Sequence, residues 1–395
     1  MWIVAVALLA GGVGAAVGHL RHRALAVVPA LLGVVAVVAG VVDAEPARAA
    51  VGDLVEPLLF VLFAVPLAVL LDEIGCFAAV ARRLPARSTA LGLWVLGAAT
   101  VALVNLDAAV VLLTPVAIRT AARAGEDARG LAVQPALLAS LSSSWLPVSN
   151  LTNLIAEEHD RRGPGAFLAH LGPPSLAAVV VGYLLWRRAW PRPAPIGKPE
   201  PTVVEPVDDR EALVVAAVAA GTLLVGFTVG GAVGVPPWIV AALVVVGLVV
   251  RTRTLPLAAV PWSSALAVAG LAVLAVAVAE QVDVGAVLGD GRGPIGLARV
   301  VGVGALGANG ANNLPTFVAG LSHLPPGKAS RWAWLLGVNM GPTVLVTGSL
   351  AGLLWLDVAR RSGLDVGWRD YARAGVLVGL PALAVATAVL TLTTG

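Results

Sequence analysis

The sequence is poor in charge and has almost no cysteine. Only 12% of its 395 residues are charged, and Cys76 is the sole cysteine. A single cysteine excludes a disulfide framework, a cysteine-based metal cage and a thiol-rich site for a soft metal. In contrast, 58% of the residues are hydrophobic and the mean hydropathy is +0.91. Apolar segments long enough to cross a bilayer recur along the whole chain, so we expect an all-α polytopic membrane protein.

Other protein classes are disfavoured by what the sequence lacks. It has no nucleophile or cofactor motif, which disfavours an enzyme, and its five histidines form no ligand pattern, so we expect neither a metal nor a cofactor. The net charge of +3 does not indicate nucleic-acid binding, because the basic residues lie in short loops between apolar segments. No basic residue precedes the first apolar run, whereas Arg21 and Arg23 follow it. This charge order is opposite to that of a cleaved signal peptide and predicts a retained helix that starts outside.

About ten apolar segments are long enough for a whole membrane crossing, which needs roughly 20 residues. They are residues 2–18, 24–42, 54–71, 131–155, 167–186, 212–230, 236–250, 263–279, 332–356 and 374–392.

Two further apolar segments are interrupted by polar residues. Residues 90–118 contain Asn105-Leu106-Asp107, and residues 295–321 contain Asn309-Gly-Ala-Asn312-Asn313. Arms of roughly 8 to 15 residues reach only about 12 to 22 Å, short of a hydrocarbon core near 30 Å. The loops before and after the first segment are both basic, so both of its ends lie on the same side. We therefore predict two re-entrant hairpins, with most basic residues inside and both termini outside.

A polar linker rich in proline and charge separates two halves of the chain. It occupies residues 187–211, between residues 1–186 and 212–395, and we place it on the cytoplasmic side. Each half reads as three helices, a hairpin, an interrupted helix and a last helix. The first half starts outside and the second inside, which predicts two inverted-topology repeats, a plan common among secondary transporters.

Helix breakers interrupt the segments 131–155 and 332–356. Pro147 lacks a backbone donor, so the first of these helices should break near residues 145–149. In the second half the breakers are Gly341, Pro342 and Gly348. Broken backbone at membrane depth is tolerated only where protein or a water-filled cavity satisfies it. We therefore expect two hairpin tips and two broken helices to meet near the midplane, at a pocket for a polar solute.

Several of these polar residues also have a purely structural interpretation. We expect the serines at 142–144 to bond within their own helix rather than to a solute. Asparagines in apolar segments could simply join helices. Asp107 could serve only as the N-cap of a helix over residues 108–118, although an ionisable group this deep in a membrane is a functional candidate.

Four motifs, in order, resemble those of one known family. They are Asp107-Ala-Ala-Val-Val-Leu-Leu-Thr-Pro115, Leu146-Pro-Val-Ser-Asn-Leu-Thr-Asn153, Asn312-Asn-Leu-Pro-Thr316 and Gly337-Val-Asn-Met-Gly-Pro342, the last followed by Gly348-Ser-Leu-Ala-Gly-Leu-Leu-Trp355. They cover both halves, and together they resemble the arsenite/antimonite efflux permeases of the ion transporter superfamily.

The resemblance implies a function, a location and a set of binding residues. It implies export of trivalent arsenic or antimony, as the neutral trihydroxide, across a bacterial cytoplasmic membrane in exchange for protons, with a soluble ATPase partner in some members. The substrate-binding residues it implies are Asn105, Asp107, Ser149, Asn150, Thr152, Asn153, Asn309, Asn312, Asn313, Asn339, Thr343, Thr347 and Ser349.

The sequence departs from the family pattern at two positions. The family usually has Asn directly before the hairpin Asp, whereas here Leu106 intervenes and Asn105 lies one place earlier. Thr347 stands where the family usually has Pro, which puts the shape of the second break in doubt.

The chemistry of these residues agrees with a neutral substrate. Asn, Ser and Thr offer both donors and acceptors, so they can hold a polyhydroxy solute without a charged partner. Asp107 is the expected proton carrier. The main alternative is a sodium- or proton-coupled carboxylate transporter of the same superfamily, whose anion an ionised Asp107 would repel. A second alternative is a membrane scaffold or sensor, which would need no polar breaks.

Overall fold

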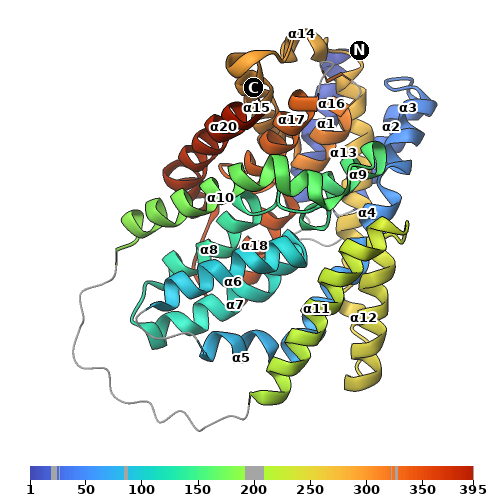
Figure 1. The fold of residues 1–395 in the computed structure, drawn as a ribbon. Helices are drawn as coiled ribbons and strands as arrows, with labels where there is room; N and C mark the ends of the chain where they lie inside the picture. Colours follow the sequence, from blue (N-terminus) through green and yellow to red (C-terminus); the bar gives the residue numbers. More distant parts are fainter. Residues whose placement is uncertain are drawn as a thin grey trace.

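The computed structural model describes residues 1–18, 25, 27–83, 88–191, 209–321, 323–324 and 328–394. Within these residues the regular structure is helical throughout, and no strand occurs (Figure 1). The chain is an all-α polytopic membrane protein, as predicted. Most of the predicted linker, residues 192–208, lies outside the described residues.

The first half of the chain contains α1 to α10. Their bounds are α1 Trp2–Gly18, α2 Val28–Val38, α3 Ala44–Gly52, α4 Val55–Glu73, α5 Cys76–Arg82, α6 Thr89–Leu103, α7 Leu106–Ala124, α8 Ala128–Leu141, α9 Leu151–Asp160 and α10 Gly163–Ala189, with a 3-10 turn at Pro147–Ser149.

The second half contains α11 to α20. Their bounds are α11 Arg210–Ala232, α12 Pro237–Thr252, α13 Trp262–Ala279, α14 Val284–Leu288, α15 Gly293–Ala311, α16 Asn313–Leu321, α17 Lys328–Met340, α18 Leu350–Arg361, α19 Trp368–Ala374 and α20 Leu380–Thr394. Two 3-10 turns lie at Leu257–Ala259 and Val346–Gly348, and a π-helical turn at Gly375–Gly379 joins α19 to α20.

Three stretches of described helix are long and apolar enough to cross a membrane by length and composition. They are Gly163–Ala189, Arg210–Phe227 and Trp368–Thr394. Shorter apolar helices account for much of the rest. The segment predicted at residues 24–42 is one of them, because α2 has only 11 residues and the chain turns at residues 39–42 before α3. At about 1.5 Å per residue, α2 is only about 16 Å long, so the prediction of a whole crossing there was wrong.

Both predicted hairpins occur as pairs of contacting helices, α6 with α7 and α15 with α16. Two of the arms are longer than expected, since α7 and α15 each have 19 residues, or about 28 Å. The extra length of α7 follows Ile118 and ends at Gly125, which caps the helix in the left-handed conformation. The helix therefore continues past the first basic residue after Ile118.

The broken helices of the two halves have matching boundaries. α8 ends at Leu141 and α17 at Met340, the 3-10 turns begin at Pro147 and Val346, and α9 and α18 begin at Leu151 and Leu350. Each pair is separated by the same interval (340 − 141 = 346 − 147 = 350 − 151 = 199 residues). A repeated unit would produce this equal spacing, and the inverted topology of the repeat stays a prediction.

A hairpin helix of each half contacts a helix of the other half. The second arm of the first hairpin, α7, packs against α18, and the second arm of the other hairpin, α16, contacts α9. The short helices α5 and α14, which lead into the two hairpins, lie at opposite ends of the molecule (Figure 1). Both chain termini lie at the α14 end (Figure 1).

Buried tryptophans tie this core together. Trp355 on α18 is 0% exposed and donates its indole N–H to the Ala132 carbonyl of α8 at 2.7 Å. Trp186 on α10 donates to the Gly130 carbonyl at 2.8 Å. Each ring fills apolar space while its single donor is satisfied, which fixes α8 between α10 and α18.

Candidate transport site

The first break begins earlier than predicted. α8 ends at Leu141, whereas the sequence suggested a break near residues 145–149. A proline clashes with the carbonyl four residues before it and favours extended backbone at the preceding residue. Leu146, directly before Pro147, is extended, with φ −137° and ψ 159°, whereas α8 already ends five residues earlier, at Leu141.

Ser149 closes the first break by local hydrogen bonds. Its Oγ accepts from the Leu146 N–H at 2.9 Å and donates to the Leu146 carbonyl at 2.7 Å. The adjacent Asn150 is the N-cap of α9, because its side chain accepts from the Thr152 N–H at 3.4 Å. Both residues are buried, and the hydroxyl group of Ser149 already donates its hydrogen bond to the backbone. Ser149 therefore holds the shape of the break in this conformation.

Of the serines at 142–144, which were expected to bond within their own helix, only Ser143 does so. Ser142 Oγ donates to the Ala98 carbonyl of α6 at 3.0 Å, and Ser143 Oγ donates to the Ser140 carbonyl at 3.0 Å. The Ser142 bond joins two helices rather than staying within one.

Asn339 connects the second half of the chain to the first break. This residue is the last but one of α17 and is 1% exposed. Its Nδ2 donates to Ser144 Oγ at 3.1 Å and to Asn153 Oδ1 at 2.7 Å. Its Oδ1 accepts from Asn150 Nδ2 at 3.1 Å and from Thr152 Oγ1. We call these five residues the Asn339 cluster, and within it the side-chain amide of Asn339 makes four hydrogen bonds, all to the other half.

The second break is held by the second hairpin. Asn309 on α15 donates from Nδ2 to the Gly341 carbonyl at 2.8 Å and accepts the Leu345 N–H on Oδ1 at 2.9 Å. Asn312 donates from Nδ2 to the Thr347 carbonyl at 3.1 Å. Backbone groups that Gly341 and Pro342 leave without helical partners are thus satisfied by asparagine side chains, as irregular backbone in a membrane requires.

Asn312 also forms the tip of the second hairpin. Its φ of +78° lies in a region that L-residues rarely adopt and that Asn tolerates better than most. Its Oδ1 accepts from the Leu314 N–H at 3.4 Å, so the residue turns the chain and caps α16.

Thr343 and Ser349 pack inside the second break. Ser349 caps α18 by accepting the Gly352 N–H at 3.1 Å. Thr343 is 2% exposed and lies against the π-helical turn, where an added Cβ on Gly375 would be 1.8 Å from the Thr343 carbonyl oxygen. Tyr371 donates its hydroxyl to the Pro342 carbonyl at 2.7 Å. This tyrosine was not predicted, because it follows the break by almost thirty residues and no local pattern marks it.

Thr347 and Gly348 complete the second break. Thr347 is only partly buried, and its carbonyl accepts the hydrogen bond from the Asn312 side chain. Gly348 lies close to Pro342, since an added Cβ would be 2.8 Å from the Pro342 Cβ. The 3-10 turn at Val346–Gly348 matches the turn at Pro147–Ser149, so Thr347 in place of the family's Pro still allows the same local geometry.

The tip of the first hairpin has buried polar atoms without partners. Asn105, not Asp107, is the N-cap of α7, and its Oδ1 accepts the Asp107 N–H at 2.7 Å. The interpretation of Asp107 as that N-cap is therefore wrong. Asn105 Nδ2 and Asp107 Oδ1 have no hydrogen-bond partner in the described part of the chain. The inserted Leu106 moves the capping role to Asn105 and leaves the Asp107 carboxyl group available.

The tip of the second hairpin also carries buried polar side chains. Asn313 is the first residue of α16 and is 7% exposed. Thr316, one turn further along α16, is also 7% exposed, and its Oγ1 has no partner. Thr316 was not among the predicted site residues, although its position three residues after Asn313 could have suggested it.

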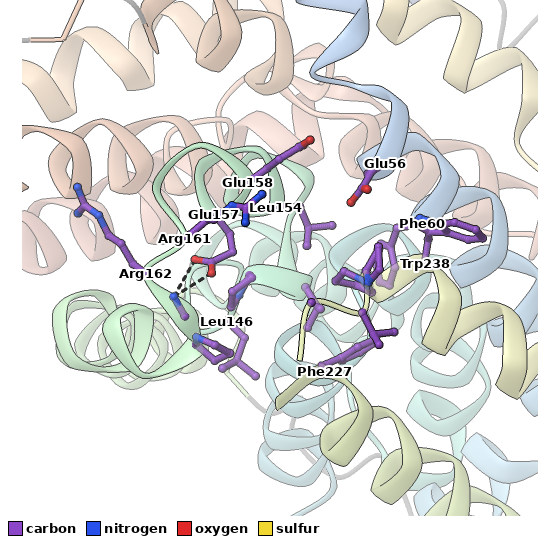
Figure 2. A pocket seen from close by; sticks show the side chains of 18 of the residues that line it. Glu56, Phe60, Leu146, Leu154, Glu157, Glu158, Arg161, Arg162, Phe227 and Trp238 are labelled. Carbon is purple, nitrogen blue, oxygen red and sulfur yellow. Dashed lines mark hydrogen bonds between the residues drawn. The ribbon is translucent and has the colours of Figure 1, made fainter. Parts of the chain in front are cut away.

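A large vestibule reaches the first break from one side. It has a volume of about 540 Å³ and lies between α4, α9 and the α11–α12 connection. Leu103, Leu146 and Pro147 line it next to the first tip and the first break. Figure 2 shows Glu56, Glu157 and Glu158 around this space together with Arg161 and Arg162.

The predicted residues are brought together only in part, since no hydrogen bond among the described residues joins Asn105 or Asp107 to the two breaks or to the second tip. The first break meets Asn339 from the other half, and the second break meets the second hairpin tip. The Asn339 cluster is fully buried, and its amides bond to one another. The expected shared solvated pocket is closed in this conformation, because protein groups occupy the hydrogen-bonding positions that a solute would take.

Known proteins resemble this chain over most of its length. It is 29% identical to the arsenical pump membrane protein of Yersinia enterocolitica over 365 residues, covering 82% of this chain and 83% of the relative. The arsenical pump membrane protein of Escherichia coli strain K12 is 29% identical over 367 residues with the same coverage. The crystal structure of the YdaH transporter of Alcanivorax borkumensis, described as having an unusual topology, matches with a TM-score of 0.53 at 17% identity over 89% of both chains, which shows the fold alone. Residues 6–364 match the citrate transporter family. This chain is a membrane transporter rather than an enzyme, and it belongs to the citrate transporter family.

Proposed function

We propose that this transporter exports trivalent arsenic and antimony, as neutral trihydroxides, in exchange for protons. The observation that carries the proposal is the Asn339 cluster, in which uncharged donors and acceptors from both halves meet in a fully buried place. A trihydroxide presents the same mixture of donors and acceptors, so it can replace these internal bonds one for one. The relatives named arsenical pump membrane proteins support the same substrate.

The charge distribution favours a neutral solute over a carboxylate. Asp107 is the only ionisable side chain in the two tips and two breaks, residues 103–107, 142–153, 309–316 and 339–349. It has the same sign as citrate, and no lysine or arginine in these stretches could offset it.

Asp107 is the residue we propose as the proton carrier. It is 2% exposed, lies in the first turn of α7 and keeps Oδ1 free of protein partners. A carboxyl group so placed can gain or lose a proton without breaking a hydrogen bond to the protein. A proton and a solute that use the same tip would then compete, which is the requirement for exchange.

Transport requires the Asn339 cluster to open. The side chain of Asn339 makes its hydrogen bonds to residues of the first break. The cluster therefore opens when α17 and the first break separate. We propose that the hairpin-bearing unit moves against the remaining helices and exposes this cluster to each side in turn. The vestibule at Leu146 and Pro147 is the entry on one side.

Orientation and partners are part of the same proposal. Both termini lie at one end of the molecule, and we place that end outside a bacterial cytoplasmic membrane (Figure 1). A soluble ATPase subunit would bind the opposite, cytoplasmic side. Reporter fusions at both termini test the orientation, since an activity that requires the cytoplasm must be absent at both.

Transport in everted vesicles tests the function. With wild-type protein, an imposed proton gradient should drive uptake of antimonite but not of citrate. Asp107→Asn should insert normally and lose the dependence on the gradient, because the amide cannot carry a proton. The matched control is Asp365→Asn, since the Asp365 carboxylate is fully exposed and should not alter transport.

A carboxylate transporter is the second candidate, because the matching family is described as a citrate transporter. The same vesicles decide between the two. Citrate uptake that antimonite does not inhibit would establish the carboxylate function and exclude the metalloid proposal.

A further inference from the structure

The second hairpin tip carries a buried hydroxyl group without a partner. Thr316 lies in the first turn of α16 and is 7% exposed, and its Oγ1 makes no hydrogen bond to the described residues. An unpaired polar group buried in an apolar segment is costly, so its presence needs an explanation.

Other helical threonines in this chain show what Thr316 does not do. Their hydroxyls donate to the carbonyl four residues earlier, the usual solution for threonine in a helix. They are Thr100, Thr114, Thr120, Thr252, Thr387, Thr393 and Thr394. The equivalent carbonyl for Thr316 belongs to Asn312 and accepts only the Thr316 backbone N–H, at 3.1 Å.

The packing of Thr316 explains which of its groups is available. An added Cβ on Gly307 of α15 would lie 2.6 Å from Thr316 Cγ2 but 3.4 Å from Oγ1. The methyl group, rather than the hydroxyl, therefore fills the space that Gly307 leaves between α15 and α16.

Asn313 lies on the same face of α16, because residues three apart in a helix are neighbours. It is also 7% exposed. Residues 300–321 contain no charged side chain, so this hairpin itself offers no counter-charge to a charged ligand, which favours a neutral one. A hydroxyl and an amide can each donate and accept, which suits a ligand that itself carries hydroxyl groups.

We propose that Thr316 and Asn313 form a subsite that binds one hydroxyl group of a neutral polyhydroxy solute. The inference rests on the proposed function, since the trihydroxide of antimony is the solute of that class. Thr316 thereby becomes a specificity-determining residue. It selects for a solute with a hydroxyl group at this position and against a cation or a carboxylate.

The test compares Thr316→Val with Thr316→Ser and with Thr114→Val. Valine has the shape of threonine without the hydroxyl, and serine keeps the hydroxyl. Thr114 is a buried threonine whose hydroxyl bonds to the Val110 carbonyl at 2.7 Å, so it is the matched control. Each purified variant is melted without ligand and with antimonite.

Without ligand, Thr316→Val should melt at or above the wild-type temperature, because it removes an unpaired polar group. Thr114→Val should melt lower, because it breaks an existing bond. With antimonite, Thr316→Val should bind about 3- to 10-fold more weakly, the loss of one neutral hydrogen bond. Thr316→Ser and Thr114→Val should bind like the wild type.

Three results would overturn the subsite. The first is a ligand-free Thr316→Val that loses as much stability as Thr114→Val, which would show an internal partner for the hydroxyl. The second is undiminished antimonite binding by Thr316→Val, which leaves the proposed function intact. The third is that sodium chloride, and not antimonite, stabilises the wild type and that Thr316→Val abolishes this stabilisation. A wild type that antimonite does not stabilise would overturn the proposed function itself and the subsite with it.

Discussion

The side chain of Asn339 is the most informative position to perturb, because it alone joins the second half of the chain to the first break by four hydrogen bonds. Asn339→Ala removes all four. Interhelical hydrogen bonds in membrane proteins contribute about 0.6 kcal/mol each on average, so four give about 2.4 kcal/mol. Buried groups left unpaired each cost about 1–3 kcal/mol, which raises the expected loss of stability toward 4 kcal/mol or more.

The assay is equilibrium unfolding in mixed micelles, as the fraction of denaturing detergent rises. Thr387→Val is the control, because its hydroxyl bonds only within α20, to the Leu383 carbonyl at 2.8 Å. We expect it to lose less than about 0.6 kcal/mol. A double-mutant cycle of Asn339→Ala with Thr152→Val should show coupling, since the two side chains share a bond. An Asn339→Ala variant as stable as Thr387→Val, or additive with Thr152→Val, would refute the account of how the halves are joined.

Two further predictions concern packing and pH. Gly375→Ala should destabilise the second break strongly, because its Cβ would be 1.8 Å from the Thr343 carbonyl oxygen. The control is Gly247→Ala, whose Cβ meets nothing within 4 Å and which should melt at or slightly above the wild-type temperature. Equal melting temperatures of the two variants would contradict this packing. The hydrogen bond from Arg82 lowers the pKa of Asp209 from its ordinary value of 3.8. A lowered carboxyl pKa contributes stability above the ordinary pKa that is lost as pH falls through the folded value. Asp209→Asn should therefore lower the melting temperature slightly at pH 7 and by less at pH 3, and an equal effect at both values would show that the ion pair plays no part.

Much of the architecture follows from local sequence. Gly341 and Pro342 place the second break where α17 ends, at Met340, since neither residue continues a helix well. The repeated order of elements was visible in the apolar runs and their interruptions. The start of the first break was misplaced because Pro147 marks only the extended residue before it, Leu146, whereas α8 already ends at Leu141.

The site was predicted less completely, because its bonds form between distant segments. Asn339 was expected near the solute, but its insertion into the first break joins residues almost 190 positions apart and depends on how the two halves pack. The capping role of Asn105 depends on where α7 starts, and an error of two residues in that start transferred the role to Asp107. The closed state of the cluster is likewise a property of the tertiary structure, since the same side chains could face water in another conformation.

The most direct test of the central claim is equilibrium dialysis of the purified transporter against antimonite, with citrate measured in parallel. Uncharged polar groups from both halves should bind antimonite saturably at one class of site. Citrate should neither bind nor compete, because Asp107 has the same charge as citrate and no basic residue lies in the tips or breaks. Saturable citrate binding that antimonite does not displace would contradict the account.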